Sequence, residues 1–326
     1  MVRPGVNENR RRSVVSSMRT RASEEVATAV REGRPVVALE STLLAHGLPP
    51  GHNRKVAARL EAVVRERGAV PATIAVLDGV ARIGLSDDEL DRVCDPDAGL
   101  VKLSQRDLGP VLGLGLSGAT TVASTCALAH SVGVGVFATG GLGGVHRGAA
   151  TSWDVSADLG VLAGTPVVVV CSGVKSVLDI PATLEVLETY SVPVLAYRTD
   201  AFPAFYLRDS GLPAPWRVDT ADQVAATVLA HRTEVPGDSG VLVANPVPSD
   251  VEMDRDLHDR LLREGLDLLR SRDVRGKDVT PVLLEHFHSG SGGASLVANE
   301  GLVVHNAEVA ADVAVAISER SGPVRA

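Results

Sequence analysis

The sequence has few aromatic residues and few cysteines. Phe, Trp and Tyr make up 3% of the 326 residues, so the core must be built from Val, Leu, Ala and Ile. The three cysteines, Cys94, Cys126 and Cys171, lie far apart and form no CxxC pair. This pattern suits a reducing, cytoplasmic environment, and we expect each cysteine to be a small buried apolar residue.

Long apolar runs and an excess of positive charge are also missing. No run approaches the roughly 20 residues needed to cross a membrane, so no membrane association is expected. The net charge of −8 argues against nonspecific nucleic-acid binding. Residues 1–22 are basic but lack the apolar core of a secretion signal. We predict that they are a disordered extension before one domain at 23–326.

Lysine is scarce, because only Lys55, Lys102, Lys175 and Lys277 occur among 32 basic residues. Arginine serves wherever a generic positive charge is needed. The remaining lysines are therefore candidates for chemistry that a guanidinium cannot perform, such as releasing a proton to become a nucleophile. A surface lysine retained by chance is the plainer explanation for Lys55 and Lys277.

Strand and helix patterns alternate along most of the chain. Buried strands are expected in "RPVVALE", "VGVFAT", "TPVVVVCSG", "VPVLAYR" and "SGVLVANP", and "ATIAVLDG" with "ARIGLS" indicates a hairpin. "SEEVATAVREG" and "SDDEL" show helix N-caps, the second as a capping box. Further helices are predicted at 119–131, 154–163, 181–190, 220–233, 251–271 and 294–318. The alternation predicts an α/β fold, a three-layer α/β/α sandwich around a largely parallel central sheet in a single domain.

Polar groups follow several of the predicted strands. Glu40 ends one strand, Lys175 follows "VVVVCSG", and Asn245 follows "VLVA". A glycine-rich stretch, "GGLGGVHRG", follows "VFAT". Because ligands bind beyond the carboxyl ends of parallel strands, these groups are expected to share one edge.

Lys175 and Glu40 each allow two interpretations. A lysine at an apolar strand end is partly desolvated, which makes a neutral, nucleophilic amine accessible, or it points outward and pairs with Asp179. Glu40 is either a buried acid with a raised pKa or a partner in an ion pair or helix cap.

The glycine-rich stretch predicts either a phosphate cradle or a sharp turn. If "WDVSADL" is helical, Asp154 and Asp158 share a face and suit Mg²⁺ or Mn²⁺, although acidic residues are also common in first helical turns. His146 lies within the stretch and is a candidate ligand contact. "GLGLSG" formally matches GxGxxG, but no acidic residue follows about 20 positions later, so it indicates a phosphate-compatible turn into a helix.

Several long blocks together resemble the pseudouridine-5'-phosphate glycosidase (pseudouridylate synthase) family. They include "ALESTLLAHGLP", "KLSQRDL", "SGATTVASTCALA", "FATGGLGGVHRGA", "WDVSADL", "CSGVKSVLDIPATLEVLETYSVPVLAYRTDAFPAFY" and "LVANPVP". They run in order from about residue 24 to 315. The chain departs from the family at Ala294 of "GGASLVAN", where the family has an acidic residue.

The resemblance implies reversible cleavage of pseudouridine 5'-phosphate to uracil and ribose 5-phosphate, with a divalent ion, usually Mn²⁺, and a homotrimer. It implies that Glu40 is the proton donor, Lys175 the nucleophile and Asp154 the metal-binding residue. The substrate contacts that it implies are Lys102, Val122, Ser156, Ala157, Asp158 and, on the base side, Asn299. His146 and Arg147 are added here as candidate phosphate donors on their charge.

Two other classes of function compete with this one. A non-catalytic nucleotide or sugar-phosphate binding protein would explain the glycines and a metal but would leave Lys175 and Glu40 without a role. A dinucleotide-dependent oxidoreductase fails on the missing acidic residue after "GLGLSG".

Overall fold

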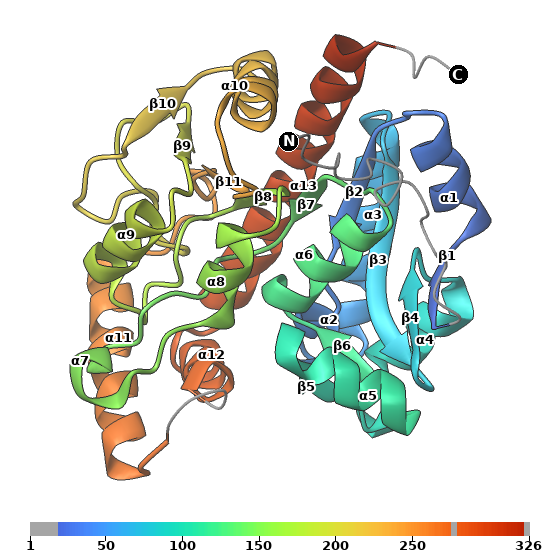
Figure 1. The fold of residues 1–326 in the computed structure, drawn as a ribbon. Helices are drawn as coiled ribbons and strands as arrows, with labels where there is room; N and C mark the ends of the chain where they lie inside the picture. Colours follow the sequence, from blue (N-terminus) through green and yellow to red (C-terminus); the bar gives the residue numbers. More distant parts are fainter. Residues whose placement is uncertain (1–18, 275–278, 323–326) are drawn as a thin grey trace, which may run out of the picture.

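An eleven-stranded, largely parallel sheet runs through the centre of the molecule (Figure 1). The structure is a computed structural model that describes residues 19–274 and 279–322. The strand order is β1-β4-β3-β2-β7-β8-β11-β9-β10, and β6 joins β3 to β5. The strands are β1 (Thr20–Ala22), β2 (Val36–Leu39), β3 (Val70–Leu77), β4 (Val80–Ile83), β5 (Val101–Leu103), β6 (Gly118–Thr120), β7 (Val136–Ala138), β8 (Val168–Cys171), β9 (Val194–Tyr197), β10 (Trp216–Val218) and β11 (Val241–Ala244).

The predicted hairpin is confirmed. β3 and β4 pair antiparallel with Ile74 opposite Ile83, and β3 also pairs antiparallel with β6. β2, β7, β8, β11 and β9 form a continuous parallel sheet, so their carboxyl ends meet at one edge. The fold class expected from the sequence, a single three-layer domain with a largely parallel sheet, is therefore confirmed.

Helices cover both faces of this sheet. They are α1 (Glu24–Arg31), α2 (Thr42–His46), α3 (His52–Glu66), α4 (Asp87–Cys94), α5 (Leu108–Leu114), α6 (Val122–Ser131), α7 (Ala149–Ser152), α8 (Ala157–Ala163), α9 (Ile180–Thr189), α10 (Ala221–Glu234), α11 (Arg255–Ser271), α12 (Val279–Gly290) and α13 (Ala294–Ser321). Short 3-10 turns lie at Pro96–Ala98 and Gln105–Asp107.

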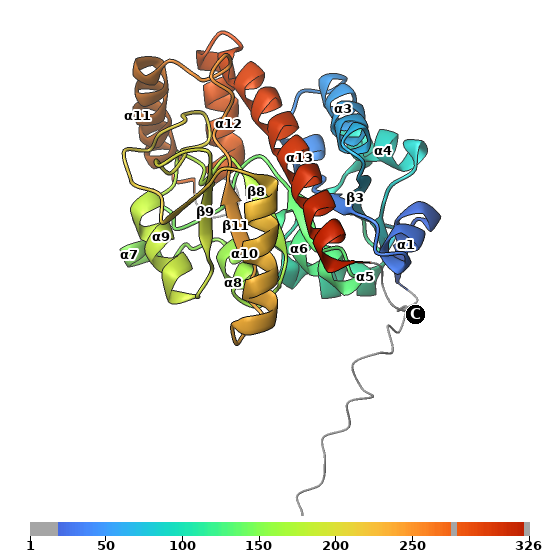
Figure 2. The same ribbon diagram turned by 90° about the horizontal axis from the view of Figure 1, so that it is seen from above.

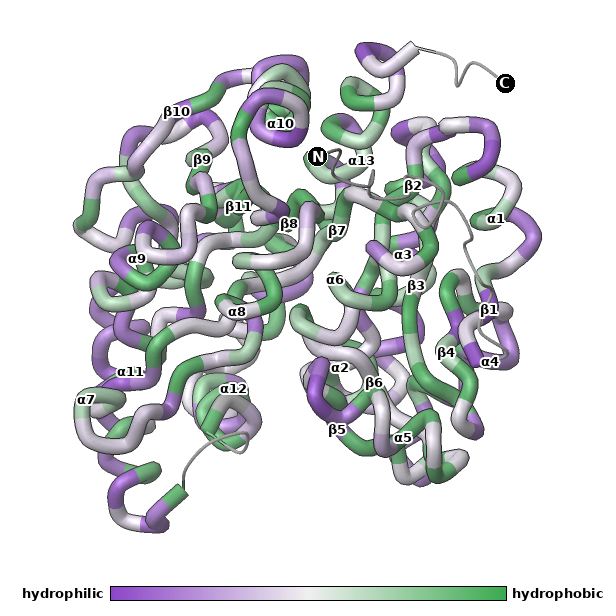
Figure 3. The backbone as a smooth tube through the Cα atoms, in the orientation of Figure 1, coloured by the Kyte–Doolittle hydropathy of each residue, from purple (hydrophilic) through white to green (hydrophobic). Residues whose placement is uncertain are grey.

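Alternate residues of the central strands feed two separate cores. In β8, Val169 and Cys171 pack into one core, whereas Val168 and Val170 pack into the other. Such continuous apolar strands are typical of a parallel sheet that is buried on both faces. The hydropathy of the residues along the chain shows the same arrangement, with apolar strands inside and hydrophilic stretches on outer helices such as α11 (Figure 3).

α13 is the longest helix and crosses one face of the sheet (Figure 2). It packs against β2, β7 and β8 and between α3 and α10. By length and composition it could span a membrane, but 61% of its most apolar window is buried inside the domain. Its apolar residues are accounted for as core residues.

The structure also differs from the sequence predictions at several boundaries. Residues 1–18 of the predicted extension lie outside the described residues, while Thr20–Ala22 already pair with β4. "GLGLSG" closes α5 with a left-handed Gly115 and enters β6, so it does not lead directly into a helix. The short elements α2, α5, α7, β1, β5, β6 and β10 were not predicted, nor was α12. The capping box at Ser86 and Glu89 and the burial of all three cysteines are confirmed.

Candidate active site

A pocket of about 460 Å³ opens at the carboxyl ends of β2, β7 and β8. Ten of the residues predicted for the site line it, although they come from seven parts of the chain. They are Glu40, Lys102, Val122, His146, Asp154, Ser156, Ala157, Asp158, Lys175 and Asn299. Asn245, expected at the same edge, does not line this pocket and lies behind it.

Glu40 directly follows β2 and receives a hydrogen bond from the hydroxyl of Thr139, which follows β7. Burial raises the pKa of Glu40 above its ordinary value, and Asp158 adds to this. Lys175, the Thr139 hydroxyl and Lys102 oppose the rise. A carboxyl group held in this way keeps its proton to higher pH than an exposed carboxyl group does, which suits a proton donor.

Lys175 lies in the segment that follows β8. Its backbone N–H donates to the Leu142 carbonyl over 3.2 Å, and its own carbonyl accepts from Leu178 over 2.9 Å. Gly173, just before it, has φ +75°, and a β-carbon there would collide with the Pro203 carbonyl. Asp179, the alternative partner considered for Lys175, instead caps α9 by accepting from Ala182.

The glycine-rich stretch serves close packing more than phosphate binding. The N–H of Gly143 donates to Asp158 Oδ2 over 2.9 Å, and the N–H of Ala123 at the start of α6 donates to Asp158 Oδ1 over 3.0 Å. The Asp158 carboxylate thus occupies backbone donors that were expected to face a phosphate. A β-carbon on Gly143 would overlap the Ser156 and Asp158 side chains.

The prediction that Asp154 and Asp158 share a helical face is wrong. α8 begins at Ala157, with Ser156 as its N-cap accepting from Asp158 N over 3.3 Å. Trp153 adopts φ +56° and ends α7, which turns the chain away from a helix before Asp154. The two carboxylates therefore reach the pocket from different local structures.

Asp154 lies beside His146, with 3.5 Å between Oδ2 and Nδ1. Burial together with Lys175 and Lys102 lowers the pKa of His146, which favours a neutral imidazole. Within the described residues, no group of three or more His, Cys, Asp or Glu side chains could hold a metal ion. The donors present fit an ion bound through one carboxylate, water and a substrate phosphate, as is usual for Mg²⁺, rather than an all-protein cage.

Lys102 of β5 and Val122 at the start of α6 form another wall of the pocket. Arg147, expected to contact phosphate, instead donates to the carbonyls of Val177 (3.1 Å) and Ser176 (3.4 Å). It therefore supports the segment around Lys175.

Three buried polar atoms that face this region have no hydrogen-bond partner among the described residues. They are Asn299 Oδ1, Thr42 Oγ1 and Ser104 Oγ. Asn299 is only 5% exposed, and an unpaired buried carbonyl oxygen is costly. Its position calls for a ligand with an N–H or O–H donor, which a pyrimidine base supplies and a phosphate dianion does not.

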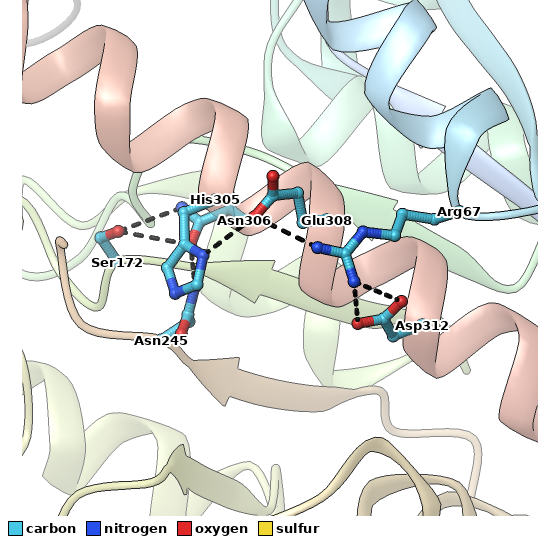
Figure 4. A network of polar contacts seen from close by, with 7 residues as sticks. All are labelled: Arg67, Ser172, Asn245, His305, Asn306, Glu308 and Asp312. Atoms are coloured by element: carbon cyan, nitrogen blue, oxygen red, sulfur yellow. Dashed lines mark hydrogen bonds and ion pairs between the residues drawn. The ribbon is translucent and has the colours of Figure 1, made fainter.

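Behind the pocket, Asn306 of α13 contacts residues that follow three strands, and two of them, Ser172 and Asn245, are drawn in Figure 4. Its Nδ2 donates to the Thr139 carbonyl over 2.8 Å and to Ser172 Oγ over 3.1 Å, and its Oδ1 accepts from Asn245 over 2.9 Å. Neither Asn306 nor Thr139 was predicted to belong to the site. For Thr139 the signal was present, because it is the last residue of the predicted strand "VGVFAT". For Asn306, within a long helix, there was none.

The fold and the pocket define an α/β enzyme with its site at the carboxyl edge of a parallel sheet. Residues 25–316 match the family described as indigoidine synthase A like protein. Pseudouridine-5'-phosphate glycosidase of Salinispora tropica is 53% identical over 310 residues, covering 95% of each chain. The enzyme of the same name from Frankia alni is 54% identical over 295 residues, covering 90% of this chain and 81% of that one.

Two solved structures have the same fold as this chain. The structure of prealnumycin C-glycosynthase AlnA in complex with ribulose 5-phosphate matches with a TM-score of 0.86 at 36% identity, covering 94% of this chain and 99% of that one. An indigoidine synthase A-like protein from Thermotoga maritima matches with a TM-score of 0.83 at 35% identity, covering 92% and 96%. The chain belongs to the pseudouridine-5'-phosphate glycosidase family.

Proposed function

We propose that this protein reversibly cleaves the carbon–carbon glycosidic bond of pseudouridine 5'-phosphate, giving uracil and ribose 5-phosphate. The observation that carries the proposal is the meeting of Lys175 and Glu40 in one pocket, in a chain about half identical to enzymes of that name. We also propose that it works in the cytoplasm as a homotrimer, as the family resemblance implies.

A carbon–carbon bond between sugar and base needs a different strategy from ordinary glycoside hydrolysis. Glycosidases protonate a leaving oxygen with one of two carboxyl groups. The base of a C-nucleoside leaves as carbon, so direct departure would create a carbanion. An amine that bonds to the sugar removes this difficulty, because its lone pair drives the departure of the base.

The neutral amine of Lys175 attacks C1' as the C1'–O4' bond breaks, and the proton that the new C–N nitrogen releases goes to O4'. The nitrogen lone pair then forms a C=N bond as the C1'–C5 bond breaks, and Glu40 delivers its proton to C5 of uracil. Water hydrolyses the iminium to open-chain ribose 5-phosphate and the neutral amine of Lys175, and the proton released returns to the Glu40 carboxylate.

The other pocket residues bind and orient the substrate in this proposal. Asn299 faces the base with its buried Oδ1, while Lys102 and the Ser156–Asp158 segment hold the sugar phosphate. Asp154, beside His146, is the residue that would hold Mn²⁺, and the ion would supply positive charge beside the phosphate. EDTA is expected to abolish activity, and added Mn²⁺ to restore it in wild type but only weakly in Asp154→Asn. Full activity after chelation would contradict the metal requirement.

The decisive experiment measures uracil release from pseudouridine 5'-phosphate in the presence of Mn²⁺. Wild type should release uracil, and Lys175→Ala should fall to background because no other group at that position can form the imine. Lys55→Ala, an exposed lysine on α3, is the matched control and should retain full activity. A protein that binds the nucleotide without releasing uracil would favour a non-catalytic binding protein.

A further inference from the structure

Ser176, the residue after Lys175, forms a buried hydrogen bond to a distant helix. Its Oγ lies 2.8 Å from Nε2 of His258 on α11, and the two residues are 4% and 3% exposed. Nδ1 of the same imidazole lies 2.9 Å from Asp259 Oδ1. The three side chains resemble a hydrolase triad, but Ser176 is not among the residues that line the described pocket, so its hydroxyl is not placed to attack a substrate.

The direction of these hydrogen bonds follows from the chemistry of the groups. The Asp259 carboxylate is an acceptor, so Nδ1 of His258 carries the proton and Nε2 accepts from the Ser176 hydroxyl. His258 lies in the first turn of α11, where the helix dipole disfavours a cation. Burial, with Arg255 and Arg147 nearby, also lowers the pKa of His258 and outweighs Asp259. A neutral imidazole therefore holds the serine hydroxyl.

The segment around Lys175 is thus fixed from several sides. Arg147 holds its carbonyls at Ser176 and Val177, and Leu142 accepts from the N–H of Lys175. The hydrogen bond from the Ser176 side chain to His258 links this segment to α11. The imidazole ring in turn packs against Phe287 of α12, with 5.6 Å between ring centroids.

We propose that His258 is a positioning residue that, through Ser176, aims the amine of Lys175 at the sugar carbon. This inference rests on the proposed role of Lys175 as the nucleophile. Most substrate-facing residues come from other segments, so loss of this hydrogen bond should leave binding nearly intact. It should slow formation of the bond between nitrogen and carbon, which depends strongly on alignment.

The test is borohydride trapping of ribose 5-phosphate on Lys175, followed by mass spectrometry of the labelled peptide. Ser176→Ala and His258→Leu should lower the maximal trapping rate about tenfold, with the half-saturating concentration changed less than about twofold. His258→Gln places an amide oxygen where Nε2 lies and should restore at least part of the rate. His258→Leu could trap slowly merely because it is less stable, which a lower Tm would reveal. Ser176→Ala removes only a hydroxyl, so it tests the same hydrogen bond with little change in packing.

A second His–Ser pair provides a matched control. His231 Nε2 lies 3.0 Å from Ser239 Oγ, but Ser239 precedes β11, at the opposite edge of the sheet from Lys175. His231→Leu and Ser239→Ala should therefore trap at the wild-type rate. The double variant Ser176→Ala/His258→Leu should be no slower than the slower single variant, because both changes remove one interaction.

Wild-type trapping rates in Ser176→Ala and His258→Leu would overturn the proposal. So would a loss confined to the half-saturating concentration, or a His258→Gln variant as slow as His258→Leu. A wild-type protein that releases uracil while Lys175 is never labelled would instead reject the imine mechanism, and this inference with it.

Discussion

At Glu40, burial and hydrogen bonding act on the same proton in opposite directions. Burial raises the pKa of the carboxyl, whereas Thr139, Lys175 and Lys102 favour the carboxylate. In the proposed mechanism Glu40 must remain protonated until the base departs, so we expect this balance to set the upper pH limit of activity. Of the groups that lower the pKa of Glu40, the Thr139 hydroxyl can be removed by a single conservative substitution.

Thr139→Val should move the alkaline limb of the kcat/KM profile to higher pH. The hydrogen bond from Thr139 lowers the pKa of Glu40, so its loss raises that pKa and keeps the acid protonated at higher pH. Thr73→Val is the matched control, since Thr73 donates to Glu61 outside the pocket lining over 2.6 Å. An unchanged limb in Thr139→Val would mean that another group sets it.

Glu40→Gln should slow uracil release by about 10²–10⁴-fold. It should also raise Tm relative to wild type at pH 8, with the difference shrinking toward pH 4. A carboxyl whose pKa is raised by folding contributes stability below its unfolded pKa and loses it as pH rises through the folded pKa. Melting curves of both proteins across this range measure the effect, and a constant difference would contradict it.

At the scale of elements, the loop after β7 and the start of α8 form one unit. Ser156 caps α8, its N–H donates to Gly144 over 2.9 Å, and Asp158 accepts from Gly143. The cap therefore fixes both the helix and the glycine-rich wall of the pocket.

Ser156→Ala should cost about 1 kcal/mol of unfolding free energy, as expected for a lost N-cap, and should also lower kcat/KM. Ser23→Ala removes the N-cap of α1, where Ser23 accepts from Val26, away from the pocket. It should cost a similar amount of stability and leave kcat/KM unchanged. Denaturant melts and uracil-release kinetics on both variants distinguish the two effects, and equal activities would place Ser156 in a purely structural role.

At the scale of the whole molecule, α13 packs against β2, β7 and β8 and contacts α3 and α10. On its buried side, Asn306 contacts residues that follow β7, β8 and β11. On its exposed side, Arg67, the C-cap of α3, forms ion pairs with Asp312 and Glu308 (Figure 4). The Asn306 hydrogen bonds are buried and the Arg67 ion pairs are partly exposed, so we expect the former to contribute more to the free energy of unfolding.

Asn306→Leu should lower the unfolding free energy by more than about 2 kcal/mol, because it leaves several buried groups unpaired. Activity should fall with it, since Thr139 and Ser172 lose a shared partner. Arg67→Ala, which removes partly exposed ion pairs, should cost less than about 1 kcal/mol and leave activity unchanged. Similar losses in both variants would contradict this difference.

The sequence predicted most of the fold because apolar strands and capped helices leave local signals. The β3–β4 hairpin, the parallel strands and the caps at Ser23 and Ser86 all followed from patterns of neighbouring residues. The helix predicted at 154–163 began too early, since its start depends on the left-handed Trp153 and on Ser156 as cap. Periodicity alone carries no information on either.

The sequence alone determined the class of fold. It also made Lys175 a candidate, because lysine is scarce, and it placed polar residues at the ends of the strands. Only the tertiary structure decided that a glycine amide holds Asp158 and that Arg147 supports the Lys175 segment. It also decided that Asn306 contacts Thr139 and that His258 contacts Ser176, each from a distant helix. Local patterns fix backbone geometry, because they depend on neighbours in the chain. Which buried donor meets which acceptor depends on how distant elements pack, and no local pattern records that.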